Sequence, residues 1–100
     1  MNIGPHYLNS KVLLAPMAGT SDKPFRIMCR EQGAALTTSE MVVLQKHLIN
    51  TNKSKHRLDF SSEKSPISIQ IAGSKAKELA ESARQAVEFG ADIIDINMGC

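Results

Sequence analysis

The sequence predicts an α/β fold in which parallel strands alternate with helices. Apolar runs of strand length recur along the chain, and a helical pattern follows the first and the third of them. Each of these two helices ends in a glycine that an alanine and the next run follow at once. Such short turns favour parallel strands joined by right-handed crossovers. A doubly wound sheet and a barrel both satisfy this pattern. The predicted strands are residues 12–15, 34–38, 67–71 and 92–97.

Composition is that of a soluble globular protein, with 42% hydrophobic and 22% charged residues. No apolar run approaches the roughly 20 residues that cross a bilayer, so we expect no membrane association and a cytoplasmic protein. The apolar run after Lys11 resembles the start of a signal peptide, but Pro16 ends it before it reaches the length of a signal-peptide apolar region. The cysteines, Cys29 and Cys100, are far apart, and the three histidines show no ligand spacing. We therefore expect neither a disulfide nor a metal site.

The first ten residues are expected to form an entry segment, a short hairpin that closes one end of a barrel. Residues 12–15 are uninterrupted apolar residues, as expected of a strand buried on both faces. Ser21 or Asp22 is placed to cap the next helix, whose first turn tolerates Pro24. Its predicted apolar face, with Cys29 in the core, comprises Phe25, Met28, Cys29 and Gln32.

Gly33 is predicted to end this helix and to lead into the second strand. Residues 41–65 are expected to form a short helix or excursion. The stretch from Lys46 to Arg57 lies in it, and between Glu40 and Asp59 there is no acid, so this part carries +4 and the rest of the chain −2. A solvated surface and contact with phosphates both remain open for it.

The third strand alternates at the strand period, so Gln70 should point away from the isoleucines at 67, 69 and 71. After it, Ser74 is expected to cap a helix that ends at Gly90. The apolar stripe predicted for this helix is Ala76, Leu79, Ala80, Ala83, Ala86 and Val87.

Two loops after the predicted strands contain a glycine, as phosphate-binding loops do. The turn Pro16-Met17-Ala18-Gly19 and the turn at Ala72-Gly73-Ser74 have one glycine each and match neither the dinucleotide fingerprint nor the P-loop. Pro16, Met17 and Ala18 offer a rigid backbone with small or soft side chains, suited to an apolar ring. A plain strand-to-helix turn explains them as well.

Polar residues gather at the ends of two strands. Asp95 and Asn97 share one face of the fourth strand, and buried polar groups of this kind need partners. A structural network and recognition of a polar ring both account for them. Gly99 permits a tight turn beside Cys100, either a reactive thiol or an apolar filler. Glu40 ends the second strand, where barrel enzymes place functional groups, although a surface acid is as plausible.

Taken in order, four motifs resemble the tRNA-dihydrouridine synthases, and the bacterial B type most of all. The resemblance runs from Ile3 to Cys100. The four segments are Ala15-Pro16-Met17-Ala18-Gly19-Thr20-Ser21-Asp22-Lys23-Pro24-Phe25-Arg26, Thr38-Ser39-Glu40-Met41, Ile69-Gln70-Ile71-Ala72-Gly73-Ser74 and Asp95-Ile96-Asn97-Met98-Gly99-Cys100.

The resemblance implies a flavoprotein oxidoreductase of tRNA processing, with FMN as cofactor, NADPH as electron donor and tRNA as partner. It assigns Pro16, Met17, Ala18 and Gln70 to the flavin, Asn97 to the target uracil and Cys100 to proton donation. The reaction reduces the carbon 5–carbon 6 double bond of uracil, and a thiol with a reference pKa of about 8.5 suits the proton transfer. The base must leave the tRNA stack to reach the flavin.

The resemblance also implies that residues 1–100 form the N-terminal half of a (β/α)8 TIM barrel, with about four parallel strands. A full barrel needs about 250 residues, so we expect a truncated piece without the rest of the barrel or the helical tRNA-binding domain. Such a piece should leave its last strand with an unpaired edge and be inactive alone; the full-length enzyme is expected to be a monomer. The alternatives are an FMN-dependent barrel that acts on a free pyrimidine and a non-catalytic RNA-binding or structural piece.

Overall fold

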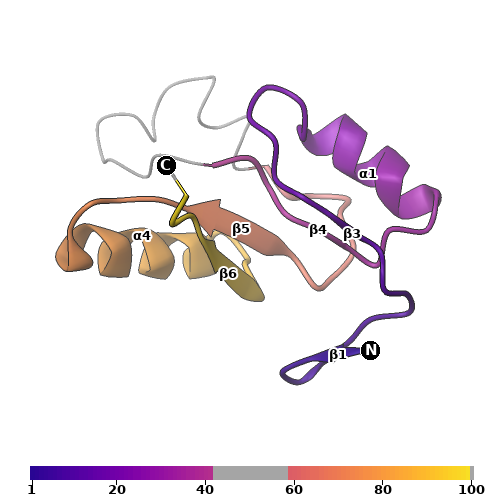
Figure 1. Cartoon of the computed structure of the whole chain (residues 1–100), viewed down its shortest axis with the longest axis horizontal. Coiled ribbons are helices and arrows are strands. Elements are labelled where there is room, and N and C mark those ends of the chain that lie inside the picture. Colours follow the sequence, from indigo (N-terminus) through magenta and orange to yellow (C-terminus); the bar gives the residue numbers. More distant parts are fainter. Residues whose placement is uncertain (42–58, 100) are drawn as a thin grey trace.

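A computed structural model describes residues 1–41 and 59–99 (Figure 1). The excursion predicted within 41–65, with its stretch from Lys46 to Arg57, lies mostly outside this range, as does Cys100. The described elements, in chain order, are β1 (Asn2–Ile3), β2 (His6–Tyr7), β3 (Leu13–Leu14), α1 (Lys23–Glu31), β4 (Leu36–Thr37), β5 (Ser68–Ile71), α4 (Ala76–Glu88) and β6 (Ile93–Ile96).

Strands β3 to β6 lie side by side in the order in which the chain visits them. Strand β3 pairs in parallel with β4, and β5 pairs in parallel with β6. A parallel bridge between Thr38 and Ser68 joins the two pairs, and the amide of Ser39 donates to the carbonyl of Ser68 at 3.0 Å. The order of these described strands never reverses, whereas reversal defines a doubly wound sheet. This arrangement bears out the predicted parallel α/β fold.

The two helices lie against different strands of this set (Figure 1). Helix α1 contacts β4, and α4 contacts β5 and β6. On the α4 side, Ile69 and Ile71 are 0% and 1% exposed and pack with Phe60 and Ala86. The predicted alternation of β5 is therefore confirmed, since Ser68 and Gln70 lie on its other face.

The N-terminal hairpin forms as predicted, with β1 and β2 antiparallel. It lies at the end of the molecule opposite the described C-terminal residues (Figure 1). Leu8, which follows it, is 2% exposed and packs with Ala35 and Leu36, while Ile93 lies against the same cluster. The segment after the hairpin thus places the Leu8 side chain against the N-terminal ends of β4 and β6.

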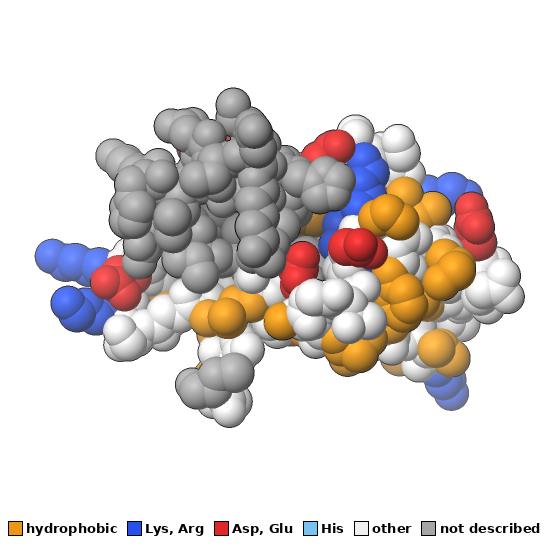
Figure 2. Space-filling view, turned by 90° about the horizontal axis from the view of Figure 1, so that it is seen from above, with side chains coloured by type: hydrophobic (Ala, Val, Ile, Leu, Met, Phe, Trp, Pro, Cys, Tyr) orange, Lys and Arg blue, Asp and Glu red, His pale blue; other side chains and the backbone are white. Residues whose placement is uncertain are grey.

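The prediction that residues 12–15 are buried on both faces is wrong. Val12 and Leu13 are 63% and 45% exposed. Among the described strands β3 has a hydrogen-bonded neighbour on one side only, so its outer surface stays in contact with solvent. Seen from above, the side of the molecule that carries α1 shows a gathering of hydrophobic side chains (Figure 2).

Helix α1 begins as predicted but buries a different residue. Asp22 is the N-cap and accepts a hydrogen bond from the amide of Phe25 at 3.1 Å. Cys29, predicted to be core, is only half-buried, and Met28 is 49% exposed. The buried residue of this helix is instead Arg26, because its guanidinium finds an acidic partner in a segment far along the chain.

Helix α4 ends before Gly90, as predicted. Its N-cap residue and its buried face differ from the prediction. The N-cap is Lys75, without a side-chain cap, and not Ser74. Of the predicted stripe, Leu79, Ala83 and Ala86 face the core, whereas Ala76, Ala80 and Val87 are exposed. Ser82 and Gln85 are buried instead. The helix is thus rotated about its axis relative to the orientation that the alanine pattern predicts.

Within residues 1–41 and 59–99, no helix combines the length and the apolar character needed to cross a bilayer. The same part of the chain holds no group of three or more histidine, cysteine or acidic side chains that could bind a metal ion.

A surface cluster at Asp59 should give a pH-dependent contribution to stability. The Asp59 carboxylate accepts hydrogen bonds from the Ser61 hydroxyl at 2.6 Å, the Ser61 amide at 3.0 Å and the Lys23 ammonium at 3.1 Å. These contacts, the Ser61 hydroxyl first, lower the pKa of Asp59 to about 2. A lowered pKa in the folded state stabilises the fold above the unfolded pKa, and that stabilisation is lost as the pH falls from about 4 toward 2.

The carboxyl NMR shift of Asp59, followed against pH, checks this expectation. Ser61→Ala should move the pKa of Asp59 part of the way back toward its ordinary value, because it removes the hydroxyl donor and keeps the backbone amide. Ser62→Ala, a change next to it that removes neither bond, is the matched control. An unchanged pKa of Asp59 in Ser61→Ala would show that the hydroxyl hydrogen bond is not the main cause of the shift.

Candidate functional site at the carboxyl ends of the strands

The loop after β3 is folded tightly around one buried hydroxyl. Ser21 is 0% exposed. Its Oγ accepts a hydrogen bond from the Met17 amide at 2.8 Å and donates to the Met17 carbonyl at 3.1 Å. The amides of Thr20 and Ser21 also donate to that carbonyl, at 3.0 and 2.9 Å. The Pro16-Met17-Ala18 segment is therefore rigid, while the Met17 side chain stays 39% exposed.

Glu40, at the end of the second strand segment, holds the same loop from the other side. Its Oε2 accepts a hydrogen bond from the Gly19 amide at 2.8 Å, and the residue is 8% exposed. Gly19 has a φ of +75°, a conformation that glycine adopts without the steric cost that a side chain adds. Glu40 is thus a buried partner of the loop, and the alternative of a surface acid is wrong.

A polar connection runs across the next two strands. The Ser39 hydroxyl accepts a hydrogen bond from the Gln70 amide at 3.2 Å. The Gln70 side chain is buried and donates from Nε2 to Oδ2 of Asp95 at 2.6 Å, in keeping with their paired positions on β5 and β6. A structural hydrogen-bond network, one of the two alternatives left open for Asp95, is therefore present. The second amide hydrogen and Oε1 of Gln70 have no partner among the described residues.

Asn97 organises the turn after β6. Its backbone amide donates to the Ile71 carbonyl at 2.9 Å, which fixes it beside the end of β5. Its Oδ1 accepts a hydrogen bond from the Gly99 amide at 2.9 Å, and its Nδ2 makes a weak 4.0 Å contact with the sulfur of Met41. The side chain of Asn97 thereby shapes the backbone that leads to Cys100, which lies outside the described residues.

These contacts bring five of the six predicted site residues to one end of the strands. Pro16, Met17 and Ala18 follow β3, Gln70 lies on β5 next to its last residue, and Asn97 follows β6. Loops at the carboxyl ends of parallel strands are the usual place for ligands in α/β proteins. The arrangement offers a rigid loop, two carboxamides, the buried carboxylate of Glu40 and the partly buried carboxylate of Asp95 within one connected set.

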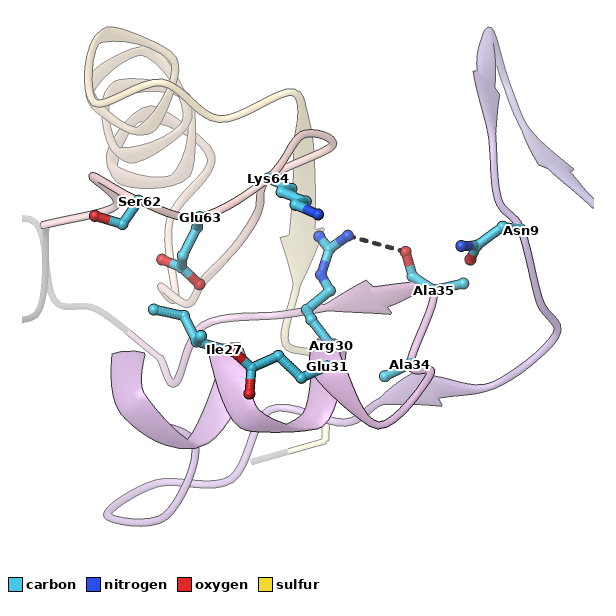
Figure 3. A pocket seen from close by; sticks show the side chains of 9 residues that line it. All are labelled: Asn9, Ile27, Arg30, Glu31, Ala34, Ala35, Ser62, Glu63 and Lys64. Atoms are coloured by element: carbon cyan, nitrogen blue, oxygen red, sulfur yellow. Dashed lines mark hydrogen bonds between the residues drawn. The ribbon is translucent and has the colours of Figure 1, made fainter.

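A cavity of about 290 Å³ lies elsewhere, between α1 and residues 62–64 (Figure 3). Arg30 reaches across it, donating to the Ala35 carbonyl at 3.1 Å and to the Pro66 carbonyl at 2.6 Å. Burial lowers the pKa of Arg30, and the charge of Glu63 partly offsets that effect. Because the cavity adjoins the start of β4, not its end, and its arginine is engaged by backbone carbonyls, we assign it a structural role.

Comparison with known proteins places this arrangement in a family. The family model described as dihydrouridine synthase matches residues 13–100. The chain belongs to the dihydrouridine synthase family. Every described element from β3 to β6, and with them the candidate site, falls within the matched range.

Curated members of the dihydrouridine synthase family match the chain over its whole length. It is 53% identical over 100 residues to tRNA-dihydrouridine synthase B of Xanthomonas campestris pv. campestris, 51% to that of Pseudomonas aeruginosa and 48% to that of Escherichia coli K12. Each match covers 100% of this chain, and 30%, 30% and 31% of the respective relatives. The chain therefore spans about a third of the length of these proteins.

Sequence reasoning missed the residues that hold this site of the dihydrouridine synthase family together. The sequence predicts only a helix cap for Ser21 and no separate role for Ser39. The sequence places Glu40 at a strand end, but the contact of Glu40 with Gly19 joins residues 21 positions apart. The one local signal for a folded loop is a serine directly before the N-cap Asp22, because a serine hydroxyl can hydrogen-bond to the backbone four residues earlier.

Proposed function

We propose that the protein is an FMN-dependent tRNA-dihydrouridine synthase, in which residues 1–100 form the N-terminal part of a (β/α)8 barrel. Membership of the dihydrouridine synthase family and relatives of that name support the proposal. The observation that carries it is the meeting of the Pro16-Met17-Ala18 loop with Gln70 and Asn97 at one end of parallel strands. The unreversed strand order supports the barrel, since neighbouring barrel strands follow in sequence.

The residues present suit an FMN ring. The loop at residues 16–18 has no bulky side chain besides the flexible, exposed Met17, so a flat apolar ring can lie against it. Gln70 has a donor and an acceptor without partners among the described residues, held in place through Asp95. A carboxamide matches the mixed donors and acceptors on the edge of an isoalloxazine ring. We therefore assign Pro16, Met17, Ala18 and Gln70 to the cofactor.

FMN, when bound and reduced by NADPH, supplies the hydride for the carbon 5–carbon 6 double bond of uracil. The protein must hold the base and provide a proton at the other carbon. We assign the first task to the side-chain amide of Asn97, whose position is fixed by its backbone bond to Ile71. We assign the second to the thiol of Cys100, which is mostly protonated at neutral pH if its pKa is near the reference value of about 8.5.

The Asn97–Gly99 hydrogen bond gives a further role to Asn97 in this proposal. This hydrogen bond joins residues two positions apart and fixes the turn directly before Cys100. In this proposal Asn97 both binds the base and fixes the backbone before Cys100. The orientation of the substrate is therefore coupled to the position of the proton donor. Positioning of this kind accounts for a large share of enzymatic rate enhancement.

The partners in this proposal are tRNA and NADPH, in the cytoplasm, with a monomeric full-length enzyme and no metal. The stretch from Lys46 to Arg57, with four cations and no acid, is the part of the sequence that suits contact with tRNA phosphates. The helical tRNA-binding domain that the resemblance implies would supply the remaining contacts.

The deciding experiment supplies the full-length protein with FMN, NADPH and tRNA lacking dihydrouridine. Dihydrouridine should accumulate in the tRNA in proportion to the NADPH consumed. NADPH-dependent reduction of free pyrimidines, without change in the tRNA, would favour the small-molecule oxidoreductase instead. Binding of tRNA without FMN binding or turnover would favour a non-catalytic RNA-binding protein.

Gln70→Met should weaken FMN binding by about tenfold. The substitution keeps the length and volume of the side chain but removes its donor and acceptor, and a neutral hydrogen bond contributes about 0.5–1.5 kcal/mol. Titration of the full-length apoprotein with FMN, followed by quenching of flavin fluorescence, measures the change in Kd.

Ser68→Ala is the matched control for this prediction. Ser68 is buried on the same face of β5, two residues earlier, and its hydroxyl accepts a hydrogen bond from Thr38 at 3.0 Å. Its loss should affect stability but leave the Kd for FMN within about twofold, because only weak indirect effects reach the ligand. Equal Kd values for wild type and Gln70→Met would remove Gln70 from the cofactor site.

A further inference from the structure

We propose that Glu40 is a positioning residue for FMN, acting through the loop at Pro16-Met17-Ala18. This inference rests on the proposed function, which assigns that loop to the cofactor. Glu40 is 8% exposed, and acidic side chains are seldom buried without a specific partner. Its Oε2 lies 2.8 Å from the amide nitrogen of Gly19, directly after the three loop residues.

This loop is held by one set of hydrogen bonds within itself and by one hydrogen bond from the neighbouring strand segment. The Ser21 hydroxyl holds the amide and the carbonyl of Met17 within the loop itself. Glu40 provides the link to another strand, since it lies 21 residues farther along the chain than Gly19. The loop therefore has its shape from Ser21 and its position relative to the neighbouring strand from Glu40.

Ser39 and Glu40 together connect both parts of the proposed cofactor site. The Ser39 hydroxyl accepts from the Gln70 amide on β5, while the Glu40 carboxylate accepts from Gly19 after β3. One dipeptide therefore makes side-chain contacts with the chain segments on both sides of it. The end of the second strand segment thus sets the spacing between the loop and Gln70, and a ring that contacts both depends on that spacing.

The carboxylate also strengthens the contact, because a hydrogen bond to a charged acceptor is stronger than one to a neutral acceptor. Glutamine at position 40 can still accept a hydrogen bond from Gly19 through its carbonyl oxygen. Alanine cannot, and it leaves the Gly19 amide to hydrogen-bond with solvent. The two substitutions therefore separate loss of the charge from loss of the link.

The test measures FMN binding to the full-length apoprotein and hydrogen exchange of residues 16–21 in its FMN-free form. Glu40→Ala should raise the Kd for FMN by about 10- to 100-fold, and Glu40→Gln by about two- to tenfold. Exchange in residues 16–21 should rise in Glu40→Ala, while exchange in α4 stays unchanged. The KM for tRNA, measured at saturating FMN, should change by less than about twofold in both variants.

Glu88→Ala is the matched control, since it removes an exposed carboxylate from α4. It should leave the Kd and the exchange of the loop as in wild type. If Glu40→Ala fails to fold, the Kd and loop exchange of Glu40→Gln decide, and values identical to wild type with an unchanged thermal midpoint overturn the inference. Equal FMN affinity and loop exchange in wild type and Glu40→Ala also overturn it.

Failure of the proposed function gives a different result. If wild-type protein binds no FMN, the proposed function is wrong and the assignment of Glu40 to FMN falls with it. If wild type binds FMN and all Glu40 variants bind it equally well, the proposed function stands and only the role of Glu40 is refuted.

Discussion

Cys100→Ala in the full-length protein should lower the rate of dihydrouridine formation by about 10²- to 10⁴-fold, the usual contribution of a positioned general acid. FMN should still bind with wild-type affinity, because the residues assigned to the cofactor are the loop at 16–18 and Gln70. Single-turnover reduction of tRNA by the pre-reduced enzyme isolates this step from reduction by NADPH. The rate of flavin reduction by NADPH should not change.

The second cysteine of the chain provides the control. Cys29 lies half-buried on α1, away from the carboxyl ends of the strands, so Cys29→Ala should retain full turnover. Because the thiol is the donor in this mechanism, wild-type turnover should also decline as the pH rises past the thiol pKa, near 8.5 for an unperturbed cysteine. Undiminished dihydrouridine formation by Cys100→Ala would show that another group supplies the proton.

The fold was predictable where the signal is local. The alternation at residues 67–71 placed Ile69 and Ile71 in the core and Gln70 on the opposite face, because side-chain direction in a strand follows from position alone. Gly33 and Gly90 end their helices with φ of +110° and +103°, the conformation that favours glycine at such positions. Both features need only neighbouring residues, so the sequence alone was sufficient.

Predictions failed where burial depends on distant residues. Alanine is apolar but small, so the pattern of α4 left its orientation undetermined, and Ser82 and Gln85 face the strands instead of Ala76 and Ala80. The site shows the same division. The end positions of Gln70 and Asn97 were predictable, but the Glu40–Gly19 contact depends on the pairing of β3 with β4, which periodicity does not specify.

Glu63→Ala should lower the free energy of unfolding by about 3–5 kcal/mol, the usual cost of leaving a buried charge unpaired. Arg26 is 3% exposed, and the Glu63 side chain 9%. Their two hydrogen bonds, Nε to Oε1 at 2.8 Å and Nη2 to Oε2 at 2.9 Å, form a bidentate pair. The Arg26 guanidinium also lies 5.4 Å from the centre of the Phe60 ring. Denaturant unfolding of the full-length protein, or its thermal midpoint if unfolding is irreversible, measures the loss.

The double variant Arg26→Met/Glu63→Leu separates the cost of an unpaired charge from the contribution of the pair. Because both charges disappear together, it should be less destabilised than Glu63→Ala. Arg26 also donates to the Ser21 carbonyl at 2.7 Å, beside the residue that holds the proposed cofactor loop. The double variant, although the more stable of the two, should therefore bind FMN more weakly than Glu63→Ala, in which Arg26 remains. The reverse order of FMN affinities would show that the loop is independent of the buried pair beneath it.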